Sequence, residues 1–162
     1  ANGQAWFNVE DTSEMAVLDP RAGQVVRRLP LAPCDGPSGL AVDDRQRLYA
    51  VCENHQMVVV SPDAKVLARP AIGAGPDGVA WMDGAAWSAN GQDGTISVVE
   101  TTSGRFATVA TLPGAAGART IAADPATHRL YLPTAELQPA RDGERRKGVP
   151  GTFYVLVLEK TH

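Results

Sequence analysis

The stretch SGLAVDDRQRLYAVCENHQMVVVSPDAKVLAR, residues 38–69, decides the fold. Turn-forming residues divide it into short apolar runs, and each run is too short for a helix. The runs are SGLAVD (38–43), RLYAVC (47–52), QMVVVS (56–61) and KVLAR (65–69). The breaks between them leave room only for tight antiparallel connections. The stretch therefore predicts one four-stranded meandering sheet, the unit that forms a blade of a β-propeller.

The same unit repeats along the chain. Its third strand, QMVVVS, has counterparts in EMAVLD (14–19), TISVVE (95–100) and TFYVLVL (152–158). Asp19 and Ser61 are 42 positions apart, and Ser61 and Glu100 are 39 apart, close to the propeller period of roughly 40–50 residues. We therefore expect an all-β fold, a partial β-propeller domain over residues 1–162. Its predicted blades are 4–29, 38–69, 77–112 and 119–158.

The predicted strands make about three and a half blades. Blade one lacks an innermost strand and blade four lacks an outermost one, whereas propellers close with four to eight blades. The third strands are apolar at nearly every position, which is typical of sheets that are covered on both faces. We therefore expect the ring to be completed by a missing N-terminal half or by a second chain. Two copies would place two three-stranded blades at each junction of a seven-bladed ring, so the sequence favours the C-terminal half of a longer protein.

Composition and charge exclude several classes of protein. The chain is 44% hydrophobic and 20% charged, which is typical of a globular domain. No apolar run approaches the roughly 20 residues that span a bilayer, so we expect no membrane span. A net charge of −3 gives no general reason to bind nucleic acid, and we expect no such partner on these grounds.

The candidate ligand site lies in the loops at one end of the propeller. The loops that join second to third strands, and each blade to the next, surround the central opening, and such loops often carry function. The candidate ligand-binding residues in them are Glu10, Asp35, Glu53, Asn54, His55, Asn90, Arg119 and Glu136. These side chains suit a small-molecule or protein ligand, or a divalent cation. Polar residues of this kind also commonly fill solvated turns.

Two cysteines, Cys34 and Cys52, are the only ones in the chain. Cys34 lies just before the innermost strand of blade two and Cys52 ends its second strand. Antiparallel pairing around residues 43–46 brings both to the same face, so a disulfide is predicted, which suits an oxidising compartment. The alternatives are two buried thiols or a metal pair with His55 as a third ligand.

Residues 135–151 form the longest loop. It carries Arg141, Arg145, Arg146 and Lys147, offset by Asp142 and Glu144. A loop of this length is usually functional or disordered. It is interpreted either as a mobile solvated segment or as a basic arm that reaches an anionic partner.

Several segments resemble the C-terminal half of bacterial YncE-like, or YVTN-repeat, β-propeller proteins. They are FNVEDTSEMAVLDPRAGQVV (7–26), LAPCDGPSGLAVD (31–43), SANGQDGTISVVE (88–100), GARTIAADPATHRLYLPTAE (117–136) and PGTFYVLVLEK (150–160). The resemblance covers essentially all of the chain, and the segment 125–136 with the ending 150–153 is its most specific part. It implies a seven-bladed, exported protein about twice this long, hence a periplasmic or secreted location.

The functional expectation is a binding propeller that is not an enzyme. No HExxH, CxxC or GxSxG motif occurs, so no catalytic or metal residue is predicted. One alternative is a lactonase-like hydrolase, for which residues of the candidate set would have to converge at the central opening; these are Glu10, Glu53, His55, Arg119 and Glu136. Another alternative is nucleic-acid binding through residues 141–147, which implies steep salt dependence.

Overall fold

The computed structural model describes residues 3–102, 104–139 and 146–159, and these residues form four antiparallel sheets of three or four strands. The predicted all-β fold of about three and a half propeller blades is confirmed. The only helical segment in the described ranges is a single 3-10 turn, η1 (Glu10–Thr12). No helix in the described part of the chain is long and apolar enough to cross a membrane.

Each sheet is a meander whose strands pair in chain order. Blade one contains β1 (Ala5–Val9), β2 (Glu14–Asp19) and β3 (Gln24–Pro30). Blade two contains β4 (Pro37–Val42), β5 (Leu48–Cys52), β6 (Gln56–Val60) and β7 (Val66–Ala68). Blade three contains β8 (Pro76–Met82), β9 (Ala85–Asn90), β10 (Thr95–Thr102) and β11 (Arg105–Pro113). Blade four contains β12 (Ala122–Asp124), β13 (Arg129–Thr134) and β14 (Tyr154–Glu159).

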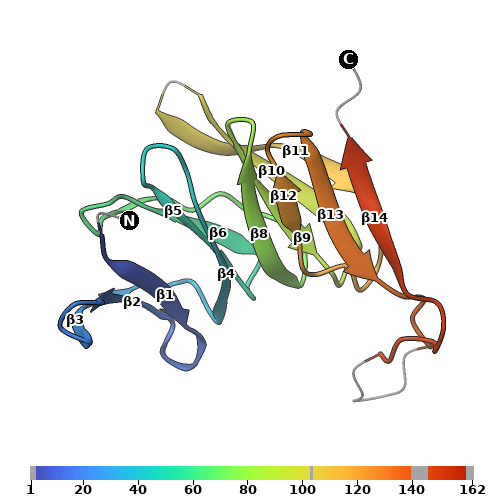
Figure 1. The fold of residues 1–162 in the computed structure, drawn as a ribbon, viewed down its shortest axis with the longest axis horizontal. Helices are drawn as coiled ribbons and strands as arrows, with labels where there is room; N and C mark the ends of the chain where they lie inside the picture. The colour runs from blue at the N-terminus through green and yellow to red at the C-terminus, as the bar shows by residue number, and fades with distance from the viewer. Residues whose placement is uncertain (1–2, 103, 140–145, 160–162) are drawn as a thin grey trace.

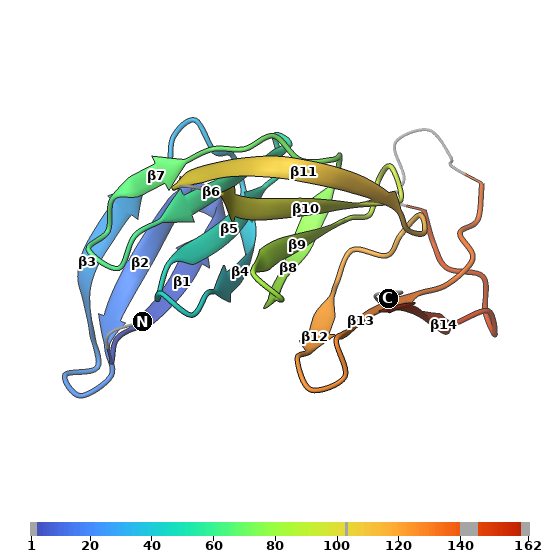
Figure 2. The ribbon, with the colours of Figure 1, turned by 90° about the horizontal axis from the view of Figure 1, so that it is seen from above.

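The four blades follow one another side by side (Figure 1). Seen from above, blade one lies on the left and blade four on the right (Figure 2). The strands β3, β7 and β11 lie along the outer side of the row, and β4, β8 and β12 lie toward the inner side. In the two four-stranded sheets the first strand therefore lies on the central side of the propeller and the last strand lies at its periphery.

The core is divided among the interfaces between neighbouring blades. On β5, Leu48, Ala50 and Cys52 pack against blade one, whereas Tyr49 and Val51 pack against blade three. Every residue of β5 is buried, because both faces of the blade are covered. This packing explains why the middle strands are continuously apolar rather than alternating.

Two glycines allow the innermost strands to approach one another. A Cβ atom on Gly39 would collide with the carbonyl oxygen of Asp77 and would lie 3.0 Å from the nitrogen of Val79. The matching glycine on β8, Gly78, would place a Cβ atom 2.9 Å from the carbonyl oxygen of Arg119. The central side of the propeller is therefore packed backbone against backbone, and a side chain has no room there.

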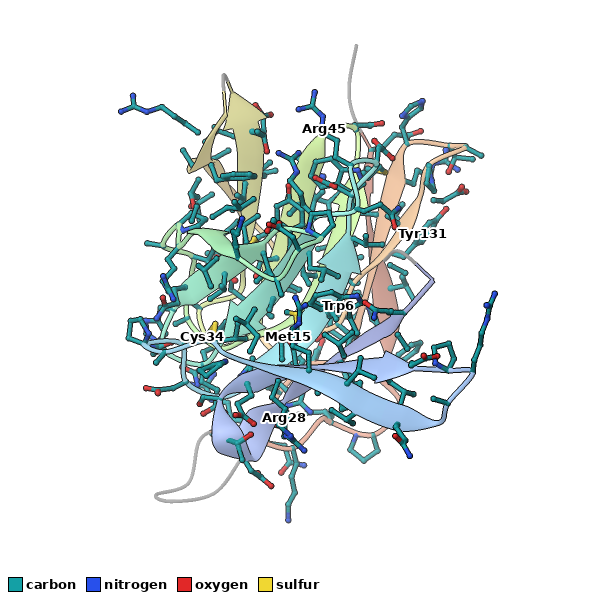
Figure 3. All side chains as sticks on the ribbon, turned by 90° about the vertical axis from the view of Figure 1, so that its left-hand side faces the viewer. Trp6, Met15, Arg28, Cys34, Arg45 and Tyr131 are labelled. Carbon is teal, nitrogen blue, oxygen red and sulfur yellow. A yellow bond between two sulfur atoms is a disulfide. The ribbon has the colours of Figure 1, made fainter. Side chains whose placement is uncertain are left out.

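An aromatic residue recurs on the second strand of every blade. Each is paired with a valine on the third strand: Trp6 with Val17, Tyr49 with Val59, Trp87 with Val98 and Tyr131 with Val157. Trp6 and Met15 lie near each other on the face of blade one that packs against blade two (Figure 3). The aromatic residues of blades two and three pack in the same way against the blade that follows. These three aromatic residues therefore belong to the cores between neighbouring blades.

A buried carboxylate organises the end of blade two that lies at the top of Figures 1 and 3, opposite the loops that join its second and third strands. Asp43 accepts hydrogen bonds from the backbone of Arg45 and Arg47, from the Arg47 side chain and, at 3.0 Å, from the hydroxyl of Tyr49. The Tyr49 ring stacks on Trp81 of blade three, and the Arg47 guanidinium lies over the Phe106 ring. This cluster therefore joins blades two and three at the same end of the molecule, next to their shared apolar core.

Candidate functional site

The loops at the lower end of the blades in Figure 1 form a continuous rim. Backbone hydrogen bonds join loops that are distant in the chain, from Leu31 to Ser13 and from Glu53 to Asp35. Gly91 donates to Gly75 and accepts from Gly117, so one hairpin of blade three contacts the loops on both sides of it. The rim is therefore a connected surface rather than a row of independent turns.

The part of the rim in blade two brings Asp35, Glu53 and Asn54 together. The Glu53 backbone N–H donates to the Asp35 carbonyl at 2.8 Å, and the Asn54 side chain accepts from the Asp35 N–H at 3.1 Å. The Asn54 amide also donates to the Pro33 carbonyl at 2.6 Å. Asn54 therefore anchors the loop, while the two exposed carboxylates remain at the surface. His55 is exposed in the same turn at φ +62°.

The predicted disulfide between Cys34 and Cys52 is confirmed, with a Cα–Cα distance of 5.5 Å. Each half of it is followed directly by a carboxylate of the rim, Asp35 after Cys34 and Glu53 after Cys52. The loop is held further by Gln56, which donates to the Pro33 carbonyl, and by Arg69, which donates to the Ala32 carbonyl at 2.7 Å. Asp35 and Glu53 therefore lie on a loop that is held by a disulfide and by several hydrogen bonds.

Asn90 lies beneath the rim and not in it. Its side chain is completely buried and donates to the hydroxyls of Thr95 and Ser97, at 3.0 and 2.9 Å. Ser88 donates to the Asn90 carbonyl oxygen at 2.9 Å, and Ser97 accepts from the Gly73 N–H. Both polar ends of the Asn90 side chain therefore take part in hydrogen bonds within the protein.

In blades two, three and four, the loop that leads into the innermost strand is attached to the rest of the blade at one equivalent position. We call this attachment the loop fastening. In the repeat, Pro37 pairs with Cys52 and Pro76 pairs with Asn90, so Cys34 and Gly73 also correspond. Blade two uses a disulfide there, and blade three uses the Asn90 network. Blade four uses Thr134, whose hydroxyl donates to the Ala116 carbonyl at 3.2 Å.

A row of polar side chains follows the inner ends of the four blades; we call it the inner row. It consists of Asn8, Ser38, Asp77 and Arg119. The Asn8 amide donates to the Ser38 carbonyl at 2.9 Å, and the Arg119 Nε lies 3.2 Å from the Asp77 carboxylate. The Arg119 and Asp77 side chains are 58% and 37% exposed, so this ion pair is open to a ligand.

Sequence analysis missed Asn8 and Ser38 as candidates. The signal that would have found Ser38 is the repeat, because PSG (37–39), PDG (76–78) and ART (118–120) occupy matching positions at the start of each innermost strand. Asn8 belongs to blade one, whose innermost strand is absent, so no repeat position identifies it. The Asn8 Oδ1 and Ser38 Oγ atoms are buried without a hydrogen-bond partner among the described residues.

The remaining predicted residues stand apart. Glu10 is exposed in η1 of blade one, and Glu136 is exposed at the base of the longest loop. That base is a short hairpin, in which Leu137 forms a β-bridge with Gly148 and Gln138 donates to the Lys147 carbonyl. Arg146 and Lys147 are exposed, whereas Arg141 and Arg145 lie outside the described residues.

One carboxylate of the rim, Asp93 in the turn between β9 and β10, is stabilised in its charged form. Partial burial of Asp93 acts to raise its pKa, but hydrogen bonds from the Thr95 hydroxyl and from the backbone of Ala74 and Thr95 outweigh this effect, and the pKa is lowered. No group of three His, Cys, Asp or Glu side chains is placed to hold a metal ion in the part of the chain that the structure describes. The described rim therefore offers fixed charges and hydrogen-bonding groups.

Comparison with known proteins gives the fold and no family. No family model matches the chain, and no curated protein sequence matches it. Its structure is similar to hydrazine synthase of Kuenenia stuttgartiensis, with a TM-score of 0.73, 18% identity, and coverage of 82% of this chain and 39% of that one. It is also similar to a streptogramin B lyase, with a TM-score of 0.68, 16% identity, and coverage of 95% and 51%.

A third similar structure is a catalytically inactive variant of virginiamycin B lyase from Staphylococcus aureus with quinupristin. Its TM-score is 0.59 at 14% identity, with coverage of 96% of this chain and 52% of that one. The chain thus spans about half the length of the two lyases and less of the synthase. These similarities extend over nearly the whole chain at low identity, and they show that it has the fold of β-propeller proteins.

Proposed function

We propose that this chain is a binding module, not an enzyme, and that it holds an anionic group of its ligand at the inner row. The observation that carries the proposal is the exposed Arg119–Asp77 pair on the central side of the rim. The Arg119 guanidinium is 3.2 Å from the Asp77 carboxylate through Nε, and its side chain is 58% exposed. A guanidinium fixed in this way suits a carboxylate or a phosphate.

The distribution of the other polar groups supports binding rather than catalysis. Asn54 and Asn90 are engaged in structural hydrogen bonds, and the carboxylates of blade two are on a different blade from Arg119. General acid–base catalysis needs a proton donor or acceptor within hydrogen-bond reach of the reacting group. Nucleophilic catalysis needs an activated nucleophile, and the described rim shows none.

Citrate and inorganic phosphate are suitable probes for this proposal, measured by isothermal titration calorimetry at low ionic strength. Binding to the wild type that is weakened at least about tenfold in Arg119→Gln is expected, since the charge-assisted hydrogen bonds are then lost. Arg21→Gln, in an exposed turn at the opposite end, is the matched control and should bind as the wild type does. No binding of either probe, or equal weakening in both variants, would refute the anionic site.

A second candidate is an enzyme of the lyase or lactonase-like hydrolase type. The observation that favours it is the structural likeness to a streptogramin B lyase over 95% of the chain. Incubation with quinupristin and with simple lactones, followed by mass spectrometry, tests it directly. Turnover that is lost in Glu53→Ala or His55→Ala would replace the binding proposal, and intact quinupristin with intact lactones would count against the enzyme.

We also propose that the protein is exported, to the periplasm or outside the cell. The disulfide is the supporting feature, because such bonds persist mainly in oxidising compartments. Nucleic-acid binding through residues 141–147 stays a prediction, and the exposed Arg146 and Lys147 are its described part. Affinity for an oligonucleotide that falls steeply with salt would support it.

A further inference from the structure

The inner row carries two opposite charges side by side. The Asp77 carboxylate lies 3.2 Å from Nε of Arg119, and both side chains reach solvent. The matching residue of blade two, Ser38, is uncharged. An anion that binds Arg119 is therefore placed next to a carboxylate that repels it, and a cation that binds Asp77 is repelled by the guanidinium in the same way. A ligand with a single kind of charge satisfies only half of this pair.

Both charged side chains extend from backbone that is held by close contacts. Strand β4 packs against the Asp77 backbone at Gly39, and β8 packs against the Arg119 backbone at Gly78. A Cβ atom on Gly91 would lie 2.8 Å from the Cβ atom of Arg119, so the base of this side chain lies directly against the turn after β9. The positions from which the two charged groups extend are therefore fixed before a ligand arrives, which lowers the entropic cost of binding.

The ion pair between Asp77 and Arg119 can be exchanged for contacts with a ligand. Ion pairs between solvent-exposed side chains contribute little to stability, because water and salt screen both charges. A ligand with one negative and one positive group replaces this single pair by two, an anion on the guanidinium and an ammonium group on the carboxylate. The short distance between Nε and Oδ2 suits a ligand whose two charged groups lie on the same or on neighbouring carbon atoms.

The charge of the rim around this pair also favours a ligand that carries a positive group. Asp35, Glu53 and Asp93 are exposed in the rim loops of blades two and three. These loops contain no Lys or Arg; they are residues 30–37, 53–55, 71–77 and 90–94. A ligand with a net negative charge approaches such a surface against its electrostatic field, whereas a ligand whose charges cancel does not.

We propose that the ligand of the inner row is a small zwitterion, in which an ammonium group lies beside a carboxylate or a phosphate. Arg119 binds the anionic group and Asp77 binds the ammonium group, each through charge-assisted hydrogen bonds. This inference rests on the anionic site proposed above and adds the positive group to it. Two ligands with the same anionic group should therefore differ in affinity when only one of them carries an ammonium group.

Two matched pairs of probes test the proposal by chemical-shift titration of the isotopically labelled protein. β-Alanine is compared with propionate, and O-phosphoethanolamine with inorganic phosphate; only the first of each pair carries an ammonium group. The wild type should bind at least one of these zwitterions about tenfold or more tightly than its counterpart, and the pair with the larger ratio identifies the anionic group. Asp77→Asn should bring that ratio to about one and still bind the simple anion, because the ammonium group loses its partner and the repulsion disappears.

Glu159→Gln is the matched control. It removes the carboxylate of another exposed ion pair, 2.8 Å from Arg129 at the opposite end of blade four, and it should bind every probe as the wild type does. The same spectra show whether each variant is folded. Equal affinity for zwitterion and simple anion, with both lost in Arg119→Gln, would overturn this inference and leave the anionic site standing. A ratio that persists in Asp77→Asn would also overturn it, and no binding of any probe would overturn both proposals.

Discussion

Gly39 lies where the innermost strands of blades two and three come closest, and its lack of a side chain is required there. We expect Gly39→Ala to lower the free energy of unfolding by about 1–3 kcal/mol, because the added methyl group would overlap backbone atoms that cannot move aside. Gly148→Ala is the control, since its Cβ would meet Ala135 at an ordinary 3.4 Å. Denaturant titration gives both values, and equal effects of the two changes would contradict the close approach of β4 and β8.

The raised pKa of the Tyr49 hydroxyl leads us to expect a loss of stability in alkaline solution. Burial, with a further contribution from the Asp43 carboxylate, raises the pKa of Tyr49 to about 12, above the value of 10.0 that applies in the unfolded chain. The folded state therefore binds this proton more tightly. The stabilisation is fully present below pH 10 and is lost as the pH rises to about 12, by on the order of 2 kcal/mol.

Thermal unfolding between pH 9 and 12 measures this effect. Tyr49→Phe should remove the part of the pH dependence that belongs to this hydroxyl, whereas Tyr131→Phe should retain it. An alkaline decline of the same size in Tyr49→Phe would mean that other groups are responsible.

The site residues show what a sequence can and cannot reveal at the residue scale. The rim loops were predicted correctly, and Glu53 and Arg119 are exposed in them. Asn54 and Asn90 were chosen for the same reason, their polar side chains in a loop, yet both are engaged in hydrogen bonds within the protein. Whether an amide faces solvent or the protein depends on which groups the fold brings to it, 19 and 21 residues away for Asn54 and 5 and 7 residues away for Asn90, and composition does not encode this.

The loop fastening is a feature of the element scale, and it can be tested by exchanging its chemistry between blades. A Cβ atom on Gly73 would lie 2.6 Å from the Asn90 amide, at the position that Cys34 and Cys52 occupy in blade two. We expect the double variant Gly73→Cys/Asn90→Cys to form a second disulfide, detected by non-reducing mass spectrometry and peptide mapping. Four free thiols or scrambled pairs would show that the two positions are not equivalent.

Removal of the native bond measures how much it contributes. The disulfide restricts the unfolded chain, and the double variant Cys34→Ala/Cys52→Ala removes this restriction. For a separation of 18 residues we expect the free energy of unfolding to fall by about 2–4 kcal/mol. Because Asn54, Gln56 and Arg69 hold the same loop, the fold should persist. Far-UV circular dichroism shows whether the fold persists, and denaturant titration measures the loss of stability. An unfolded variant would contradict the expectation that the other hydrogen bonds hold the loop.

Strand positions were predictable because turn residues and apolar runs alternate so regularly. The exceptions lie at blade four, which was predicted to begin at residue 119 with a third strand over 152–158, whereas β12 and β14 span Ala122–Asp124 and Tyr154–Glu159. The pairing of β12 with β13 stops at Ala122 and Tyr131, although β13 continues to Thr134. The apolar run alone does not show where this pairing stops.

For the whole molecule, burial predicts a gradient of local stability across the four blades. The middle strands of blades two and three are covered on both faces, whereas β3 is exposed at nearly every residue and β14 at most. We expect the slowest amide hydrogen exchange in β5, β6, β9 and β10, and the fastest strand exchange in β3 and β14. Uniform protection of all the strands would contradict this gradient.

The number of blades could be deduced from sequence because each blade is a repeat that contacts only its neighbours. The ring as a whole could not, because a repeat that contacts only its neighbours does not fix how many repeats complete a circle. The same locality explains why similarity to proteins with other activities shows the fold alone. A blade records how to pack against the next blade and nothing about the ligand over the central opening.

The loop fastening also bears on how the protein can be produced. Only the disulfide of blade two needs an oxidant to form. Synthesis in a reducing cytosol should therefore leave the hydrogen bonds of Asn90 and Thr134 intact, and blade two alone would lack its fastening. With two cysteines in the chain, there is a single intramolecular pairing to reach on later exposure to air. Oxidation after purification therefore cannot form an incorrect disulfide within one chain, and an isomerase is not required for the correct bond.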